Sequence, residues 1–295
     1  AYEDLQPDMV VVLGDRYEII SAVAAALFYK LPVAHLHGGE ITEGAYDDCI
    51  RHAITKMSHL HFTSTETYRQ RVIQLGEDPQ RVFNVGAPGI ENIKRISLMN
   101  KEELEATLDG FTLGNKSLLV TYHQVTLDNS EAAEQVQNLL QALDEFLEYK
   151  VIFTLPNSDT DGHVIIKLIN NYVAKNMQRA IAYPSLGLQR YLSALKYVKA
   201  VVGNSSSGII EVPSFGIPTL NIGDRQRGRI AAESVMNCGT SKEEIVSGLN
   251  QILVSEFVPI SMKNPYEGEN TIGDILNVIK VYRLEGLIQK SFYNL

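Results

Sequence analysis

Short, continuous apolar runs alternate along this chain with segments of helical periodicity. The run MVVVL at residues 9–13 ends in Gly14-Asp15, and apolar residues at helical spacing follow from Ile19 to Leu27. Continuous apolar runs of this length are typical of strands in a parallel sheet that is covered on both faces. In the first third of the chain the same alternation predicts further strands at 32–36, 60–64 and 81–85, and helices at 47–57 and 65–75.

A second series of the same kind begins after a polar, charged stretch at residues 96–115, which we interpret as the connection between two domains. The pattern predicts strands at 117–122, 151–155, 180–183, 200–203 and 219–222, and helices at 132–148, 162–175 and 188–195. We therefore predict two doubly wound, Rossmann-like α/β domains that face each other across a cleft. The predicted first domain is 1–96 and the second is 116–275; a C-terminal helix at 276–295 is expected to pack back on the first.

Composition excludes several classes of function. The formal net charge of −9 argues against nucleic acid or an anionic membrane as a partner, because both require a basic face. Cys49 and Cys238 lie far apart and belong to no cluster with metal-ligand spacing, and the longest apolar runs fall short of a membrane span. We expect a soluble cytoplasmic enzyme that binds no metal. An anionic substrate must then be bound by a local group of hydrogen-bond donors and basic residues.

The segment from Val201 to Arg229 carries the strongest signal for binding. A strand ends at Gly203, and a turn rich in hydroxyl groups then opens a short helix that reaches about Phe215. Exposed N–H groups at such a turn favour a phosphate. The candidate binding residues here are Ser205, Ser206, Ser207, Glu211, Arg225 and Arg229. In the alternative interpretation Asn204 and the serines only cap the helix.

Acids and histidines gather at the predicted strand ends of the first domain. Asp15 follows the first strand, where it could alternatively cap a helix. His37 and Glu40 follow the second strand, and the side chains of His35 and His37 are expected to share one face. Asp47 and Asp48 open the next helix, with Arg51 one turn later as a partner for Asp47. Open α/β active sites are assembled from successive loops at one sheet edge.

Several of these motifs resemble a known family. GDRYE, HLHGGE, YDDCIRHAITKMSHLHF and GNSSSGIIEVPSFGIPTLNIGDRQRGR are similar to segments of the hydrolysing UDP-N-acetylglucosamine 2-epimerases, which have the glycosyltransferase-B fold. The resemblance implies that Asp15 and Asp47 are catalytic acids, with His37 and Glu40 as alternative candidates for a further catalytic residue. It also implies that Ser205 and Ser206 bind a diphosphate, Glu211 a ribose and Arg225 the phosphates or the neighbouring loop. Two further residues match the family, His123 at the leaving group and Asn157 near the nucleotide.

The position of His123 in the sequence also supports a functional role, independently of the resemblance. It directly follows the predicted strand at 117–122, where an imidazole can donate a hydrogen bond to a phosphate oxygen. A capping or solvent-facing role is the alternative for a histidine at this place.

The resemblance implies a reaction that converts UDP-N-acetylglucosamine and water to N-acetylmannosamine and UDP, in a homodimer or homotetramer and without a cofactor. Alternatives are a UDP-2,4-diacetamido-2,4,6-trideoxyglucose epimerase, a UDP-sugar glycosyltransferase of the same fold and a non-catalytic nucleotide-binding protein. The likeness runs from Pro7 to about Leu287, and the opening strand and Gly/Ser/Arg turn of the family are not found before Ala1. We therefore expect an incomplete first domain and a 295-residue chain that is poorly soluble or self-associates.

Overall fold

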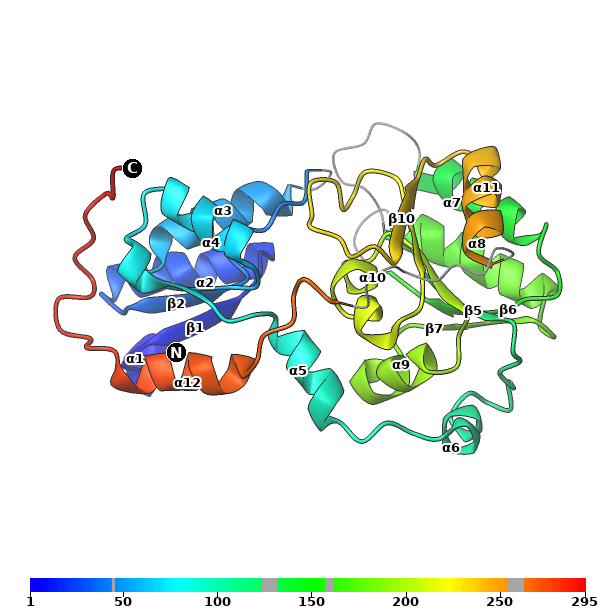
Figure 1. Ribbon diagram of the computed structural model, residues 1–295, viewed down its shortest axis with the longest axis horizontal. Helices are drawn as coiled ribbons and strands as arrows, with labels where there is room; N and C mark the ends of the chain where they lie inside the picture. Colours follow the sequence, from blue (N-terminus) through cyan, green and yellow to red (C-terminus); the bar gives the residue numbers. More distant parts are fainter. Residues whose placement is uncertain (44–45, 124–131, 157–161, 254–262) are drawn as a thin grey trace. The chain divides into compact units, whose positions relative to one another are not determined.

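The computed structural model describes residues 1–43, 46–123, 132–156, 162–253 and 263–295, and the chain forms two compact units (Figure 1). The first unit comprises Ala1–Asn92 and Pro265–Leu295, and the second comprises Ile93–Asn264. The structure thus places the polar stretch 96–115 in the second unit and residues 265–275 in the first, which differs from the boundaries expected from composition.

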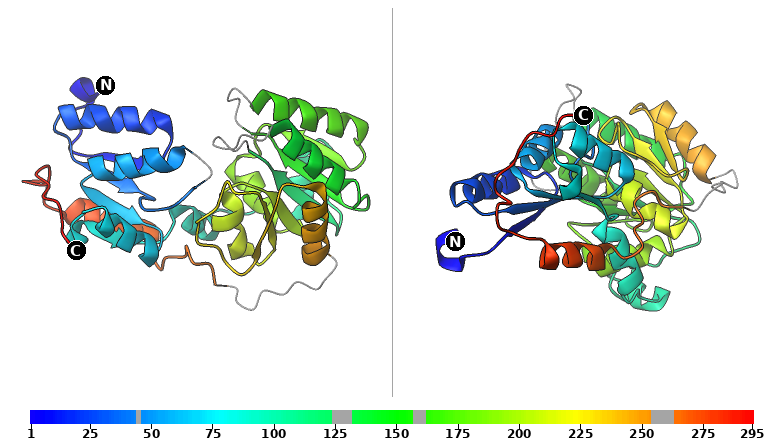
Figure 2. Two further views of the ribbon diagram at one scale, coloured as in Figure 1. Left: turned by 90° about the horizontal axis from the view of Figure 1, so that it is seen from above. Right: turned by 60° about the vertical axis from the view of Figure 1, so that its left-hand side comes forward.

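The first unit is built on a four-stranded parallel sheet with the order β1-β2-β3-β4. Its strands are β1 (Val10–Leu13), β2 (Val33–Leu36), β3 (Leu60–Thr63) and β4 (Val82–Asn84). Its helices are α1 (Tyr2–Leu5), α2 (Tyr17–Phe28), α3 (Asp47–Met57), α4 (Glu66–Gln74), η1 (Pro79–Arg81) and α12 (Thr271–Val281). Helices α2, α3 and α4 lie on one face of the sheet and α12 on the other (Figures 1 and 2).

The last residues of the chain form a strap on the first unit, which we define as residues 284–295. The predicted C-terminal helix at 276–295 is wrong beyond Val281, where α12 ends. Leu287 is buried in the core beside α12, and the Lys290 ammonium lies 2.7 Å from the buried carboxylate of Glu77. Burial alone would raise the pKa of Glu77, but hydrogen bonds and charges from His61, Lys290 and Lys56 outweigh it and lower the pKa to about 2.

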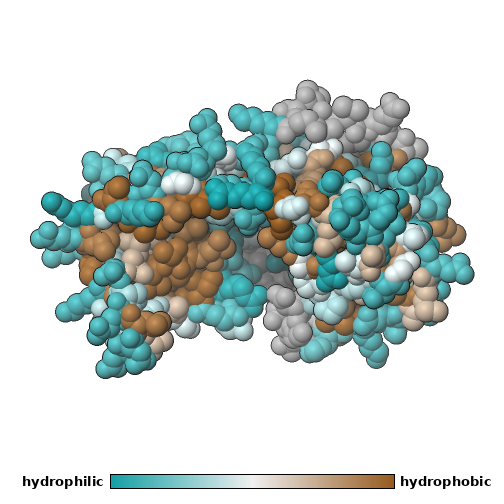
Figure 3. Space-filling view, turned by 90° about the horizontal axis from the view of Figure 1, so that it is seen from below, coloured by the Kyte–Doolittle hydropathy of each residue, from teal (hydrophilic) through white to brown (hydrophobic). Residues whose placement is uncertain are grey.

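Strand β1 is an edge strand with an apolar surface. Val11 and Leu13 remain 52% and 53% exposed, and Figure 3 shows apolar residues gathered on this unit. An exposed apolar edge strand is a template for association with another strand. Self-association of the chain stays a prediction.

The second unit holds a six-stranded parallel sheet with the order β10-β9-β8-β5-β6-β7. Its strands are β5 (Ser117–Thr121), β6 (Lys150–Thr154), β7 (Ala180–Tyr183), β8 (Ala200–Gly203), β9 (Thr219–Ile222) and β10 (Val235–Cys238). Its helices are α6 (Lys101–Ala106), α7 (Ala132–Leu143), α8 (Gly162–Lys175), α9 (Gly187–Leu195), α10 (Ser207–Ile210), η2 (Val212–Phe215) and α11 (Lys242–Leu253), and α5 (Pro88–Arg95) crosses the division between the units.

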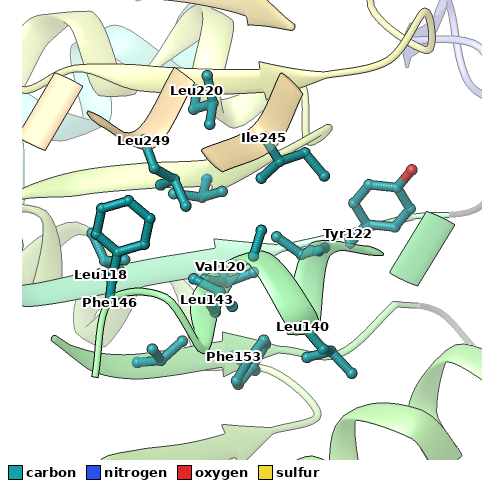
Figure 4. Packing of buried hydrophobic residues seen from close by; sticks show 14 of the residues in the cluster. Leu118, Val120, Tyr122, Leu140, Leu143, Phe146, Phe153, Leu220, Ile245 and Leu249 are labelled. Carbon is teal, nitrogen blue, oxygen red and sulfur yellow. The ribbon is translucent and has the colours of Figure 1, made fainter. Parts of the chain in front are cut away.

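Alternation along the central strand β5 divides the core of the second unit into two layers. Leu118 and Val120 point toward α7, α8 and α11, whereas Leu119 packs with α6 and α9 on the opposite face. Figure 4 shows the first layer, with the labelled side chains Leu118, Val120, Leu140, Leu143, Phe146, Phe153, Leu220, Ile245 and Leu249. Both faces of the sheet are therefore covered, as a doubly wound fold requires.

The prediction of doubly wound parallel α/β architecture is confirmed. Strands β7, β8 and β9 and helices α3 and α8 have the expected bounds. Helix α7 ends at Leu143 rather than 148, and the pattern analysis missed β10 and α11. No helix in the described part of the chain combines the length and apolarity needed to cross a bilayer.

We predict that His59→Asn makes the free energy of unfolding less dependent on pH between about 6.5 and 4. The His59 ring accepts a hydrogen bond from the Val33 N–H, and burial, with Lys290 and other cations, lowers its pKa to about 4. Because the unfolded pKa is about 6.5, this neutral histidine stabilises the fold above that pH, and stability falls as the unfolded chain takes up a proton. Asparagine can accept the same bond without titrating.

The slope of the free energy of unfolding against pH should fall by roughly 1.4 kcal/mol per pH unit at most. Urea unfolding at pH 7, 6 and 5 measures it. His163→Asn, at an exposed position on α8, is the control and should leave the slope unchanged. Identical slopes for His59→Asn and wild type would contradict the prediction.

Candidate functional site

The order of the second sheet reverses between β5 and β8, and ligands of open α/β folds bind at the carboxyl ends of strands at such a point. His123 follows β5 and Asn204 follows β8. The Asn204 side chain bridges them, since its Oδ1 accepts from the His123 N–H at 2.7 Å and its Nδ2 donates to the His123 carbonyl at 2.7 Å. Gly203 permits this close approach, because a Cβ there would overlap the carbonyl oxygen of Thr121.

The hydroxyl-rich turn after β8 leads into the short helix α10. Ser206 is the residue before the helix, and its side chain makes no capping hydrogen bond; Ser205 Oγ lies 3.4 Å from the Ser207 N–H. The Ser207 hydroxyl is 2.6 Å from the hydroxyl of Tyr191, whose pKa is raised by burial and by the nearby Glu211 carboxylate. The Ser206 hydroxyl therefore does not cap the helix, and the Ser207 hydroxyl pairs with Tyr191.

The loop after β9 reaches back to the same turn. Arg225 Nη1 and Gln226 Nε2 donate to the Asn204 carbonyl at 3.1 and 2.9 Å. Arg229 lies further along the loop, where its N–H donates to the Gln226 carbonyl. The structure thus brings Arg225 to the end of β8 as expected, whereas Asn157 lies outside the described residues.

His123 is neutral at pH 7. Burial, with a smaller contribution from the Arg225 cation, lowers its pKa to about 4. A neutral imidazole still has one N–H, so it can donate a single hydrogen bond to an anionic group without carrying charge.

In the first unit, Asp15 forms an ion pair with Arg51. Helix α2 begins after Arg16, so Asp15 is not its capping residue, and the Asp15 carboxylate instead accepts from Arg51 Nη2. The Arg51 side chain is 1% exposed and belongs to α3. The pair therefore ties the loop after β1 to the helix after β2.

Arg51 also organises the loop that precedes α3. It donates to the Glu40 carbonyl at 2.8 Å, to Thr42 Oγ1 at 2.7 Å and to Asp48 Oδ1 at 3.2 Å. Asp47, the neighbour of Asp48, is the first residue of α3 and is partly exposed. The guanidinium is thus surrounded by acceptors from several loops, which a buried cation requires.

His37 and Glu40 form a hydrogen-bonded pair at the end of β2. His37 Nδ1 lies 2.6 Å from Glu40 Oε1, which also accepts from the Ser64 hydroxyl at 2.7 Å. Glu40 is 2% exposed and His37 is 15% exposed. Gly39, which adopts φ +78°, is required between them because a Cβ would overlap the carbonyl oxygen of Tyr68.

His35, a buried residue of β2, contacts the turn that carries Asp15. Burial lowers the pKa of His35 to about 3, so the ring is neutral, and its Nε2 lies 2.9 Å from the Gly14 carbonyl. Because a carbonyl only accepts, Nε2 bears the proton and Nδ1 faces the Thr55 hydroxyl at 3.2 Å. The alternation of side chains along a strand does not apply to His37, because β2 ends at Leu36 and His37 has φ +66°. The prediction that His35 and His37 share a face therefore loses its premise.

The structure brings the sequence-predicted residues into two groups, one in each unit. The first contains Asp15, His37 and Glu40, with Asp47 at the start of the helix that carries Arg51, and the second contains His123, Ser205, Ser206, Ser207, Glu211 and Arg225. Sequence reasoning missed the central position of Arg51 and the contacts of Tyr191 and Gln226. No set of three or more histidine, cysteine, aspartate or glutamate side chains with metal-binding geometry is found among the described residues.

Comparison with known proteins identifies close relatives. The chain is 46% identical over 237 residues to the GDP/UDP-N,N'-diacetylbacillosamine 2-epimerase (hydrolyzing) of Campylobacter jejuni, covering 80% of this chain and 62% of that relative. It is 41% identical over 292 residues to polysialic acid biosynthesis protein P7 of Escherichia coli, covering 98% of this chain and 74% of that relative. The chain thus spans less than two thirds of the length of the Campylobacter relative.

A solved structure supports the same fold. UDP-GlcNAc 2-epimerase from Neisseria meningitidis bound to UDP-GlcNAc superimposes with a TM-score of 0.79 at 20% identity, covering 95% of this chain and 78% of the other. The family model for UDP-N-acetylglucosamine 2-epimerase matches residues 1–280. With this match and two relatives above 40% identity, the chain belongs to the UDP-N-acetylglucosamine 2-epimerase family.

Proposed function

We propose that this chain carries out hydrolysing 2-epimerisation of UDP-N-acetylglucosamine, which yields N-acetylmannosamine and UDP. The observation that carries the proposal is the assembly of Asp15, His37 and Glu40 around Arg51 in a member of this family. We propose a cytoplasmic homodimer or homotetramer that needs no cofactor.

In this proposal the second unit binds UDP. The N–H groups of the serine turn and the hydroxyls of Ser205, Ser206 and Ser207 donate to the diphosphate, and Glu211 accepts from the ribose hydroxyls. Arg225 and Arg229 supply positive charge beside it. Support comes from the position of the turn at the reversal of strand order, where Arg225 is already bonded to the Asn204 carbonyl.

The carboxylates of the first unit act on the sugar. Asp15 or Asp47 removes the proton from C2 while the C1–O bond breaks, so that both electrons of that bond leave with UDP and a double bond forms between C1 and C2. An acid then delivers a proton to C2 on the opposite face while water adds its hydroxyl to C1, and the remaining proton of the water restores that acid. The released sugar is therefore the C2 epimer of the sugar in the substrate, and the carboxyl group that took the C2 proton gives it up to solvent.

We infer that His37 and Glu40 act as a pair in this chemistry. Glu40 is enclosed and already accepts from His37 and Ser64, whereas His37 retains some exposure. A carboxylate that orients a histidine and stabilises its protonated form is a recurring arrangement for proton transfer. In this pair His37 contacts the substrate, and Glu40 positions the His37 ring.

Departure of UDP is the step at which His123 contributes. The imidazole N–H donates to a phosphate oxygen, and the negative charge that develops there favours this bond more in the transition state than in the bound substrate. The low pKa of His123 means that it works as a neutral hydrogen-bond donor rather than as a cation.

The 2,4-diacetamido sugar nucleotide is the second candidate substrate, favoured by the name of the 46% identical relative. Bacillosamine differs from glucosamine at C4 and C6, which do not react, so both substrates suit the same acids. Proton NMR of the products formed from each UDP-sugar decides between them.

We predict that Glu211→Ala weakens UDP binding by roughly 10-fold to 100-fold, as expected for the loss of hydrogen bonds to a charged group. Calorimetric titration with UDP measures this. Glu148→Ala, which removes an exposed carboxylate from the same unit, should bind UDP as wild type does. Unchanged affinity in a folded Glu211→Ala protein would remove Glu211 from the site.

Asp15→Asn and Asp47→Asn should each lower kcat by at least about 100-fold, because proton transfer at C2 requires a carboxylate. UDP affinity should change by less than a few fold, since UDP binds the other unit. Asp4→Asn, at an exposed site on α1, is the control. Full turnover in either catalytic variant, with only a lowered melting temperature, would assign that aspartate a structural role.

Turnover in D2O separates this reaction from glycosyl transfer. The epimerase releases UDP without any acceptor, and its product should carry deuterium at C2, because the proton delivered there comes from a group that exchanges with solvent. Mass spectrometry and NMR of the released sugar measure the label. UDP release only on addition of an acceptor would instead identify a glycosyltransferase.

A further inference from the structure

The HGGE turn, which we define as residues 37–40, is held by a cation that the chemistry proposed above does not use. Arg71, a partly exposed residue of α4, donates through Nη1 to the Gly39 carbonyl at 2.5 Å. The two residues are 32 positions apart in the sequence. The bond therefore ties α4 to the turn that carries both His37 and Glu40.

A second cation holds the next carbonyl of the same turn. Arg51, from α3, donates to the Glu40 carbonyl at 2.8 Å, so two successive carbonyl oxygens accept from guanidinium groups of two different helices. Hydrogen bonds with a charged donor are among the strongest in proteins. Together they fix the peptide planes on both sides of the Glu40 Cα atom, and hence the direction in which the Glu40 side chain leaves the backbone.

Packing fixes the place from which Arg71 reaches the turn. A Cβ at Gly39 would overlap the Tyr68 carbonyl oxygen, so α4 lies directly against the turn. The Arg71 guanidinium lies 5.4 Å from the centre of the Tyr68 ring, and the buried Tyr68 hydroxyl is 3.0 Å from the hydroxyl of Tyr266. A planar guanidinium over an aromatic ring keeps a restricted orientation.

The HGGE turn requires such support because its backbone adopts a sparsely populated conformation. His37 has φ +66° and Gly39 has φ +78°. A non-glycine residue at positive φ persists only where surrounding contacts compensate. Catalytic geometry tolerates little error, and a displacement of about 1 Å can cost about 100-fold in rate. A loosened turn would therefore lower turnover in a protein that remains folded.

We propose that Arg71 is a positioning residue for the His37–Glu40 pair. Its bond to Gly39 sets the direction of the Glu40 carboxylate, which in turn orients the His37 ring. The assignment rests on the proposed function, in which this pair transfers a proton. Because Arg71 acts through the turn and not on the substrate, its loss should appear in kcat rather than in KM or in UDP affinity.

The test is Arg71→Met, which keeps a side chain of similar length on the Tyr68 ring but has no donor. We expect kcat for UDP release from UDP-N-acetylglucosamine to fall by about 10-fold to 100-fold, with KM and the UDP Kd within about threefold of wild type. Arg71→Lys keeps a cation that can reach the Gly39 carbonyl and should recover most of the lost kcat. Arg71→Gln, whose neutral amide is too short for that contact, should lose as much as Arg71→Met and replaces it if the methionine variant does not fold.

A second readout does not depend on turnover. In protein labelled with 15N-histidine, the Nδ1 proton that His37 donates to Glu40 should give a downfield NMR signal, identified by its absence in His37→Gln. Arg71→Met should shift or broaden this signal, and Arg71→Lys should restore it.

Arg69→Met is the matched control. Arg69 lies on the same helix, is partly exposed and donates through Nε to a backbone carbonyl at 2.9 Å, that of Val82 in β4, which does not neighbour β2 in the sheet. This variant should lower the melting temperature about as much as Arg71→Met, while kcat and the His37 signal stay unchanged.

Equal losses of kcat in Arg69→Met and Arg71→Met would show that any loosening of α4 suffices, which overturns the proposal. Wild-type kcat and an unchanged His37 signal in Arg71→Met overturn it as well. If wild type releases no UDP from either candidate UDP-sugar, the proposed function fails, whereas the His37 signal still decides whether Arg71 positions the pair.

Discussion

The arrangement of the acids depends on one buried cation. Arg51 is almost fully enclosed, and its guanidinium contacts Asp15, Thr42, Asp48 and the Glu40 carbonyl. A charge in such a place is tolerated only when its donors are satisfied, because desolvation costs several kcal/mol. The loops after β1 and β2 must therefore keep their relative positions, and the acids they carry are held in a fixed geometry before any substrate binds.

In the second unit a neutral side chain holds the loops of the candidate site in position. Asn204 joins the ends of β5 and β8 through two hydrogen bonds to His123, and its carbonyl accepts from Arg225 and Gln226. Asn204 thus connects the histidine to the loop after β9, through its side chain on one side and its backbone carbonyl on the other. Gln226 is 4% exposed, so this network lies within the folded unit and not at its surface.

Periodicity was sufficient to predict most strands and helices, because parallel strands buried on both faces read as apolar runs. It failed for β10, an edge strand with the exposed residue Asn237, whose pairing with β9 is a tertiary property. The strand-end acids were predictable from their positions, but the role of Arg51 was not. From sequence, a charged residue within a helix such as Arg51 is expected to face solvent. Its burial depends on the pairing with Asp15, which lies 36 positions away in the sequence.

The geometry around His37 bears on a choice that sequence left open between His37 and Glu40. A non-glycine residue with φ +66° is held in a sparsely populated conformation, which persists only where surrounding contacts compensate. Here the Glu40 carboxylate accepts a short hydrogen bond from the imidazole, while Ser64 and the tight turn at Gly39 fix the carboxylate. The enclosed carboxylate would have to give up both bonds to reach a substrate, whereas the imidazole would not. In the function proposed above, the two residues therefore act as one proton-transferring unit, in which Glu40 orients the imidazole ring and His37 contacts the sugar.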